Sequence, residues 1–211
     1  MKLGIIDYGS GNLHSVEHAL VHAAAEIKGA SFIERVTTAA ELGMCDQIVL
    51  PGVGHFADCF NGLMEVDGMV EALYDAVMIR GRPFLGICVG MQLLAEYGEE
   101  GGVTTTGLGW MSGGITRMTP MMDNRPLKVP HMGWNNISDL KSPLFQGLPT
   151  EHQVYFVHSY YVPLNEYTIA TTDYSNDFSA AIKKNNFYAV QFHAEKSGDI
   201  GEQILEKFLA L

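Results

Sequence analysis

The 211-residue sequence predicts an α/β fold with a mostly parallel central sheet, flanked by helices and extended by antiparallel strands. In the first half, short apolar runs alternate with segments of helical periodicity. The second half instead contains short β-like segments separated by turn residues. The hydrophobic fraction of 47% is ordinary for a globular protein, and no repeat or linker interrupts the chain. We therefore expect one domain over residues 1–211.

The first half supplies the expected parallel strands and the helices between them. Buried strands are predicted from their apolar composition at residues 3–7, 47–50 and 83–88. Helical spacing of apolar residues follows each strand, at 16–23, 56–78 and 90–95. Strands and helices that alternate in this way are typical of a parallel sheet covered on both faces.

The second half is expected to extend this sheet. Short β-like segments occur at residues 113–118, 127–131, 154–158, 167–171 and 180–183. A further apolar strand is predicted at 187–193, and a helix at 200–209 closes the chain. We expect the short segments to add antiparallel strands to the sheet.

Composition excludes several classes of protein. The net charge of −11 argues against nucleic-acid binding, which requires a basic surface. No apolar run is long enough for a membrane-spanning helix, and the first apolar run ends at Asp7, too early for a signal peptide. The three cysteines are an odd number in a chain that is not cysteine-rich, so free thiols in the cytoplasm are expected.

Cys88 is the candidate nucleophile because it stands in Gly-Ile-Cys-Val-Gly between a predicted strand and a predicted helix. Glycines two positions away on either side allow a sharp, strained turn at the cysteine. The following helix would favour a thiolate, and the N–H of Val89 would serve as an oxyanion donor. The alternative is a buried core cysteine with packing glycines. Cys45 and Cys59 lack this setting and are expected to be inert.

His193 and Glu195 are the candidate base and its orienting carboxylate. They follow an apolar strand, on which alternate residues project to the same face. A histidine is the usual base for a thiol, and a carboxylate can hold its ring. The carboxyl ends of parallel strands can bring Cys88 and His193 together. Alternatively, both could be surface residues at a strand exit.

Gly52 and Val53 lie in a Pro-Gly-Val-Gly loop after the strand at 47–50, and this loop is a candidate second oxyanion element. An ordinary strand-to-helix loop is the alternative.

His14, His18 and His22 share helical spacing, but a metal site needs further ligands, and a solvated polar stripe is the better interpretation. The Gly9-Ser10-Gly11 segment lacks the third glycine of a dinucleotide-binding loop. No metal or cofactor is expected.

In combination, the segments at 51–54, 86–92 and 193–195 resemble the class I, triad-type glutamine amidotransferases. The segments at 7–13, 130–135, 155–161 and 193–197 are similar to the amidotransferase subunits of imidazole glycerol phosphate synthases. This resemblance covers nearly the whole chain. One departure is Ala194, where many relatives carry proline; we expect it to affect loop stiffness and not chemistry.

The resemblance implies a glutaminase that passes ammonia to a (β/α)8 cyclase subunit in a heterodimer that serves histidine biosynthesis. Gly52, Gln92, Ser159 and Tyr160 would help to hold glutamine. The partner interface would include Met132, Trp134, Asn135 and Lys196, although the sequence is equally compatible with Trp134 in the core. Two other functions stay open, namely a different cysteine hydrolase, such as a γ-glutamyl hydrolase or another pathway's amidotransferase, and a redox sensor.

Overall fold

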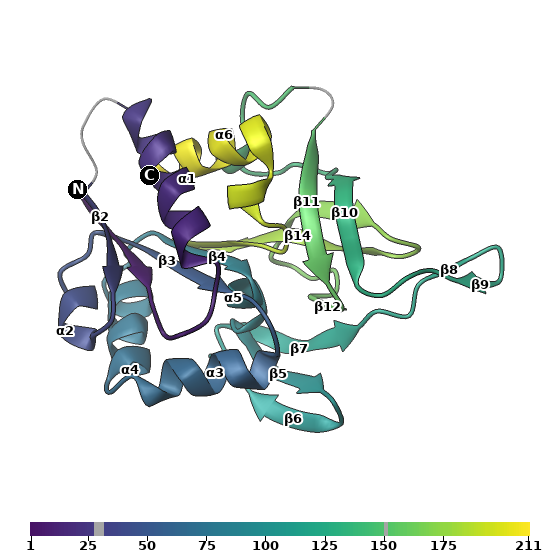
Figure 1. Ribbon diagram of the computed structural model, residues 1–211, viewed down its shortest axis with the longest axis horizontal. Coiled ribbons are helices and arrows are strands. Elements are labelled where there is room, and N and C mark those ends of the chain that lie inside the picture. The colour runs from purple at the N-terminus through teal and green to yellow at the C-terminus, as the bar shows by residue number, and fades with distance from the viewer. Residues whose placement is uncertain (28–31, 150–151) are drawn as a thin grey trace.

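A seven-stranded sheet forms the centre of the computed structural model, which describes residues 1–27, 32–149 and 152–211 (Figure 1). The strand order is β13-β14-β15-β4-β3-β1-β2. The five strands from β15 to β2 are parallel, whereas β14 and β13 are antiparallel additions at one edge. In this order the strands comprise Thr168–Asp173, Asp177–Lys184, Phe187–Val190, Phe84–Cys88, Gln47–Gly52, Lys2–Ile6 and Phe32–Val36. The predicted fold class is confirmed.

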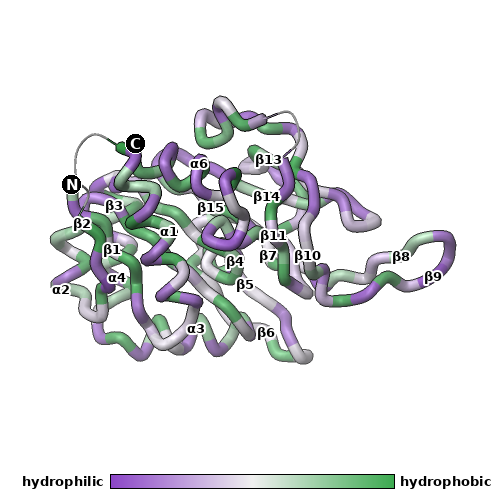
Figure 2. Tube along the Cα trace, turned by 45° about the horizontal axis from the view of Figure 1, so that its top comes forward, coloured by the Kyte–Doolittle hydropathy of each residue, from purple (hydrophilic) through white to green (hydrophobic). Residues whose placement is uncertain are grey.

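Helices cover both faces of this sheet. Helices α1 (Leu13–Ala25) and α6 (Gly198–Leu209) pack together on one face, and α2 (Ala39–Leu42), α3 (Phe56–Glu65) and α4 (Met69–Tyr74) lie on the other (Figure 1). Every residue of the central strands β3 and β4 is buried. Figure 2 shows the corresponding hydrophobic interior and the hydrophilic segments of the outer helices. This burial on both sides explains the continuous apolar runs in the sequence.

The helix predicted over 56–78 is wrong as a single element. Helix α3 ends at Glu65, α4 starts at Met69, and a π-helical turn, η1, follows at Asp75–Ile79. Gly68 stands between the two helices with a φ of 68°, a left-handed conformation that an α-helix cannot include. Strand β2 was not predicted, because as a partly exposed edge strand it carries Glu34 and Arg35 within its apolar pattern.

Two other expectations also need correction. The helix after Cys88, α5, comprises only Val89–Gln92, because the chain turns into strand β5 at Ala95. No strand covers 127–131; strand β10 starts at His131 instead. Pro130 lies within that segment and has no N–H to donate to a strand partner.

The short strands of the second half mostly form separate small sheets. Strands β5 (Ala95–Glu100), β6 (Val103–Thr106), β7 (Met111–Arg117) and β12 (Tyr160–Tyr161) form one sheet in the order β12-β7-β5-β6. Strand β10 (His131–Asn136) pairs with β11 (Gln153–His158) in a two-stranded antiparallel sheet. The β8–β9 hairpin (Met121–Met122 and Arg125–Pro126) projects from the body (Figure 1). Of the short segments, β13 and β14 extend the central sheet as predicted.

None of the helices in the described ranges has both the length and the hydropathy that crossing a membrane requires.

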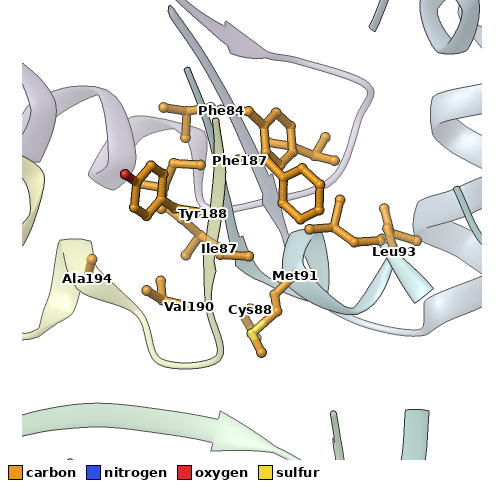
Figure 3. Packing of buried hydrophobic residues seen from close by; sticks show 14 of the residues in the cluster. Phe84, Ile87, Cys88, Met91, Leu93, Phe187, Tyr188, Val190 and Ala194 are labelled. Carbon is orange, nitrogen blue, oxygen red and sulfur yellow. The ribbon is translucent and has the colours of Figure 1, made fainter. Parts of the chain in front are cut away.

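Aromatic side chains pack the interior around the paired strands β4 and β15. The Trp110 ring lies 5.3 Å from that of Phe84 and 5.8 Å from that of Phe187, centroid to centroid. Figure 3 shows Cys88 at the end of β4, just beyond Ile87, with Val190 at the end of the neighbouring strand. The core therefore holds two strand ends side by side at one edge of the sheet.

Candidate active site

Cys88 occupies the tight turn that the sequence predicts. Its φ of 55° and ψ of −110° lie outside the regions that residues other than glycine normally adopt. The turn brings Gly90 so close to β3 that an added Cβ would lie 1.9 Å from the carbonyl oxygen of Leu50. An added Cβ at Gly86 would lie 2.8 Å from the Gly90 carbonyl oxygen. The two glycines are therefore required for the close approach that presents Cys88 at the end of β4.

His193 and Glu195 form a buried hydrogen-bonded pair. The distance from His193 Nδ1 to Glu195 Oε1 is 2.8 Å, and the two side chains are only 2% and 1% exposed. The strand predicted over 187–193 ends at Val190, so alternation along a strand does not explain the pairing. Instead, the 3-10 turn η3 (Ala194–Lys196) returns the carboxylate to the ring. The prediction that both groups project to the same side is confirmed, but the reason given for it is wrong.

The histidine turn is held by backbone and hydroxyl contacts. The N–H of His193 donates to the Tyr155 carbonyl at 2.9 Å. Ser197 Oγ donates to the His193 carbonyl at 2.6 Å and accepts the Tyr155 N–H at 3.0 Å. Strand β11 therefore anchors the imidazole, and sequence reasoning assigned no such role to Ser197.

Electrostatics link His193 to the cysteine as well as to the carboxylate. Burial lowers the pKa of His193, but hydrogen bonding and charge from Cys88 and Glu195 raise it more, to about 10 from 6.5. Because Nδ1 donates to Glu195, Nε2 is the ring atom left for the sulfur. Among the described residues, Nε2 has no hydrogen-bond partner. The sulfur and the imidazole line the same cavity, and the sulfur contributes to the raised pKa of the imidazole.

A cavity of about 280 Å³ opens over Cys88 and His193. Of the residues predicted to bind substrate or an oxyanion, Val53, Val89, Gln92, Ser159 and Tyr160 line it, whereas Gly52 does not. Sequence reasoning missed Glu100, Pro130, Val157 and His158, which also line the cavity. It also missed Gln191, whose Nε2 lies 3.7 Å from the Cys88 sulfur. Gln191 could have been found from the sequence, because it is a polar amide inside the apolar run before His193. No feature of the sequence indicates a role for Glu100.

Side chains of other elements donate hydrogen bonds to the backbone carbonyls of the loop that carries Gly52 and Val53. Tyr8 Oη donates to the Pro51 carbonyl at 2.8 Å. The Val53 carbonyl accepts from Ser10 Oγ at 2.8 Å and from Cys59 Sγ at 3.3 Å. Burial raises the pKa of both Tyr8 and Cys59, which keeps these two donors protonated. The loop therefore has a defined conformation beside the cysteine turn.

The interface candidates divide into three exposed residues and one that is partly buried. Met132 and Trp134 are 63% and 55% exposed on β10, so the alternative of Trp134 in the core is wrong. The Trp134 ring rests edge-on against that of Tyr155, with 6.0 Å between centroids. Lys196 is exposed. The Asn135 amide instead donates to the Asp173 carbonyl at 2.8 Å and is partly buried.

The helical histidines do not gather around a common point. His14 and His18 have ring centroids 6.5 Å apart, while His22 pairs with Glu202 of α6. Within the part of the chain that the structure describes, no three His, Cys, Asp or Glu side chains are grouped as metal ligands would be.

A thiol on a strained strand–helix turn, beside a buried imidazole–carboxylate pair at the carboxyl edge of a parallel sheet, defines an α/β protein of the cysteine-triad class. Residues 4–211 match the family described as "Glutamine amidotransferase class-I". The chain belongs to this family and, within it, to the HisH subunits of imidazole glycerol phosphate synthase.

The relatives support both levels of this assignment. The Brucella melitensis imidazole glycerol phosphate synthase subunit HisH is 46% identical, over 99% of this chain and 98% of its own length. The Bacteroides fragilis subunit HisH is 44% identical over the full length of both chains. Among solved structures, one titled a glutamine amidotransferase has a TM-score of 0.70 at 16% identity and covers 98% of both chains. A glutamine amidotransferase from Thermotoga maritima has a TM-score of 0.61 at 15% identity, covering 100% of this chain and 83% of its own. At these identities the structural matches support the fold.

Proposed function

We propose that this chain hydrolyses glutamine to glutamate and ammonia for imidazole glycerol phosphate synthase, in histidine biosynthesis. A cyclase subunit would use the ammonia to make imidazole glycerol phosphate and aminoimidazole carboxamide ribotide. The observation that carries the proposal is the cavity over Cys88 and His193, with Glu195 hydrogen-bonded behind the imidazole, in a chain of the HisH family.

Cys88, His193 and Glu195 are the proposed catalytic residues. The Cys88 sulfur attacks the side-chain carboxamide carbon of glutamine while His193 Nε2 holds the thiol proton. When the tetrahedral intermediate collapses, the C–N bond breaks, the proton passes to the nitrogen, and ammonia leaves a glutamyl thioester. His193 then removes a proton from water, which attacks the thioester and releases glutamate and the thiol. Glu195 accepts the Nδ1 hydrogen and stabilises the imidazolium.

Two backbone N–H groups, on residues that line the cavity together with Cys88, are the proposed oxyanion donors. Val89 is the first residue of α5, so its N–H has no acceptor within the helix and is available to the oxyanion. The Gly52–Val53 peptide is the second candidate, on the loop that Tyr8, Ser10 and Cys59 hold from behind. Gly52 ends strand β3 opposite Cys88, and Val89 directly follows Cys88, so both proposed donors are anchored at two neighbouring strand ends of the sheet.

Substrate binding is proposed for Gln92, Ser159 and Tyr160, together with Glu100. Glu100 contributes a carboxylate to the cavity wall, and its Oε2 accepts the Phe56 N–H at 2.8 Å. A fixed negative charge there suits the α-ammonium group of glutamine. The small cavity leaves room for one amino acid with an extended side chain.

The proposed partner is a (β/α)8 cyclase subunit, in a cytoplasmic heterodimer. Met132, Trp134, Asn135 and Lys196 are proposed interface residues; Met132 and Trp134 form an exposed apolar pair on β10, and Trp is favoured as an interface anchor. A closed passage between the two active sites would keep ammonia from being protonated and lost to water.

Two measurements on the purified chain test this function. When the cyclase subunit is present together with its nucleotide acceptor, glutamate release should accelerate strongly, and Cys88→Ala should abolish it while leaving the complex assembled. Activity without any stimulation would favour another amidotransferase or a γ-glutamyl hydrolase. A chain with a reactive Cys88 but no glutaminase activity in any mixture would favour a redox sensor.

A further inference from the structure

Two buried histidines outside the proposed triad form a hydrogen-bonded pair between β10 and β11. His131 and His158 are cross-strand partners, 3% and 6% exposed. His131 Nδ1 lies 3.0 Å from His158 Nε2, and His158 Nδ1 lies 2.8 Å from the Tyr160 carbonyl oxygen. At the other end, Asn135 Nδ2 lies 3.2 Å from His131 Nε2. The chain of contacts thus runs from the outer strand β10 to the cavity wall.

The direction of donation follows from the acceptor at the inner end. A carbonyl oxygen only accepts, so His158 Nδ1 carries the hydrogen and its Nε2 accepts. His131 Nδ1 must therefore donate, and its Nε2 accepts from Asn135. Burial, the largest cause for both rings, lowers the pKa of His131 to about 4 and that of His158 to about 3, so both are neutral at pH 7.

The packing around His131 prevents the pair from reorienting. Its ring stacks on Tyr174 at 4.2 Å and on Phe156 at 4.9 Å, centroid to centroid. The Asn135 amide is itself fixed, because its second hydrogen goes to the Asp173 carbonyl at 2.8 Å. The direction of each hydrogen bond from Asn135 through the two histidines to the Tyr160 carbonyl is thus fixed.

At the cavity, this network reaches Gln92 through the Tyr160 carbonyl. Gln92 Nε2 donates one hydrogen to that carbonyl at 2.9 Å and the other to Gln191 Oε1 at 3.0 Å. Because both amide hydrogens are used, the Gln92 oxygen is the atom left for the cavity. In the opposite orientation the amide would place hydrogens toward the positively charged α-ammonium group of glutamine.

We propose that His131 and His158 are positioning residues for glutamine binding, which hold the Tyr160 carbonyl so that the Gln92 amide presents its oxygen to the cavity. This inference rests on the proposed glutaminase function. It assigns the two histidines no contact with the reacting atoms; they act through Tyr160 and Gln92. Their effect should therefore fall on glutamine affinity and little on the chemical step.

Glutamine affinity in the Cys88→Ala chain, measured by titration calorimetry, tests the proposal without turnover. In that background, His158→Leu removes the donor to Tyr160 and should weaken glutamine binding about tenfold. His158→Asn places an amide N–H where Nδ1 was, and should keep affinity within about threefold of the parent chain. His131→Phe keeps the stacking but removes the hydrogen bond that His158 Nε2 accepts from His131, and should give an intermediate loss.

The outcomes separate this inference from the proposed function. If the parent chain binds no glutamine, the proposed function fails and the inference fails with it. If the parent binds glutamine and His158→Leu and His158→Asn bind equally well, only the inference is overturned. Nitrogen NMR of the wild-type imidazoles gives a second measurement if a variant does not fold. Both rings should be in the Nδ1–H tautomer at pH 7, and an Nε2–H tautomer in either ring would refute the relay.

Discussion

Replacing Gly90 by alanine should distort the turn at Cys88 through a steric clash. The clash should cost more stability than placing alanine at an uncrowded glycine with a positive φ. The new Cβ would lie 1.9 Å from the Leu50 carbonyl oxygen and 3.0 Å from the Leu50 carbonyl carbon. Ordinary contact needs roughly 1.5 Å more separation, and the atoms in the way belong to the backbone of the fully buried strand β3. Either the sheet or the turn must move. Overpacking of this severity should cost about 3–5 kcal/mol of unfolding free energy.

Gly81→Ala is the matched control for this substitution. Gly81 has a φ of 68°, but nothing lies within 4 Å of an added Cβ, so only backbone strain of about 1 kcal/mol is expected. Urea unfolding gives the stability of both variants, and the alkylation rate of Cys88 reports whether the turn is intact. Gly90→Ala should be the less stable variant and should have altered Cys88 reactivity. Equal stability of the two variants, with wild-type reactivity at Cys88, would refute the steric argument.

Three further predictions concern the site and the interface. Glu195→Gln removes the charge behind the ring, so kcat should fall by about 100-fold and the NMR pKa of His193 should drop; an unchanged pKa would contradict the pairing. Because folding raises the pKa of His193 from 6.5 to about 10, its contribution to stability is complete below pH 6.5 and is lost as pH rises through 10. The unfolding free energies of wild type and His193→Gln should therefore differ most at low pH and converge toward pH 10, and a constant difference would count against the shift. Trp134→Ala should raise the Kd for the cyclase subunit by about 30-fold while changing the unfolding free energy by no more than about 1 kcal/mol. Equal affinity of the wild-type protein and the variant for the cyclase subunit would exclude Trp134 as an anchor.

Sequence patterns identified the elements whose residues are buried on both sides. Strands β1, β3 and β4 are apolar almost throughout, and their order along the chain alternates with helices. Strand β2 was missed because its edge position permits charged residues at 34 and 35. Helix α5 was expected to be longer because apolar residues have helical spacing over 90–95, which includes Leu93 and Leu94. Their burial next to strand β5 decided their structure instead.

The site was predictable where it depends on local spacing. The glycines around Cys88 and the two-residue spacing of His193 and Glu195 are visible in the sequence. Glu100 reaches the cavity through tertiary structure, because no neighbouring residue in the sequence lines it, whereas His158 lies beside Ser159 and Tyr160, which were predicted to bind substrate. The two neutral histidines could not be distinguished from titrating ones until their burial was known.

Selective labelling of the thiols tests most directly whether the sulfur and the imidazole act as one reactive pair. A glutamine-derived electrophile should modify Cys88 at neutral pH, and peptide mass spectrometry should find Cys45 and Cys59 unmodified. The His193→Ala chain should be labelled far more slowly at pH 7. Labelling of Cys45 or Cys59 in preference to Cys88, or an unchanged rate at Cys88 after removal of the imidazole, would contradict the account.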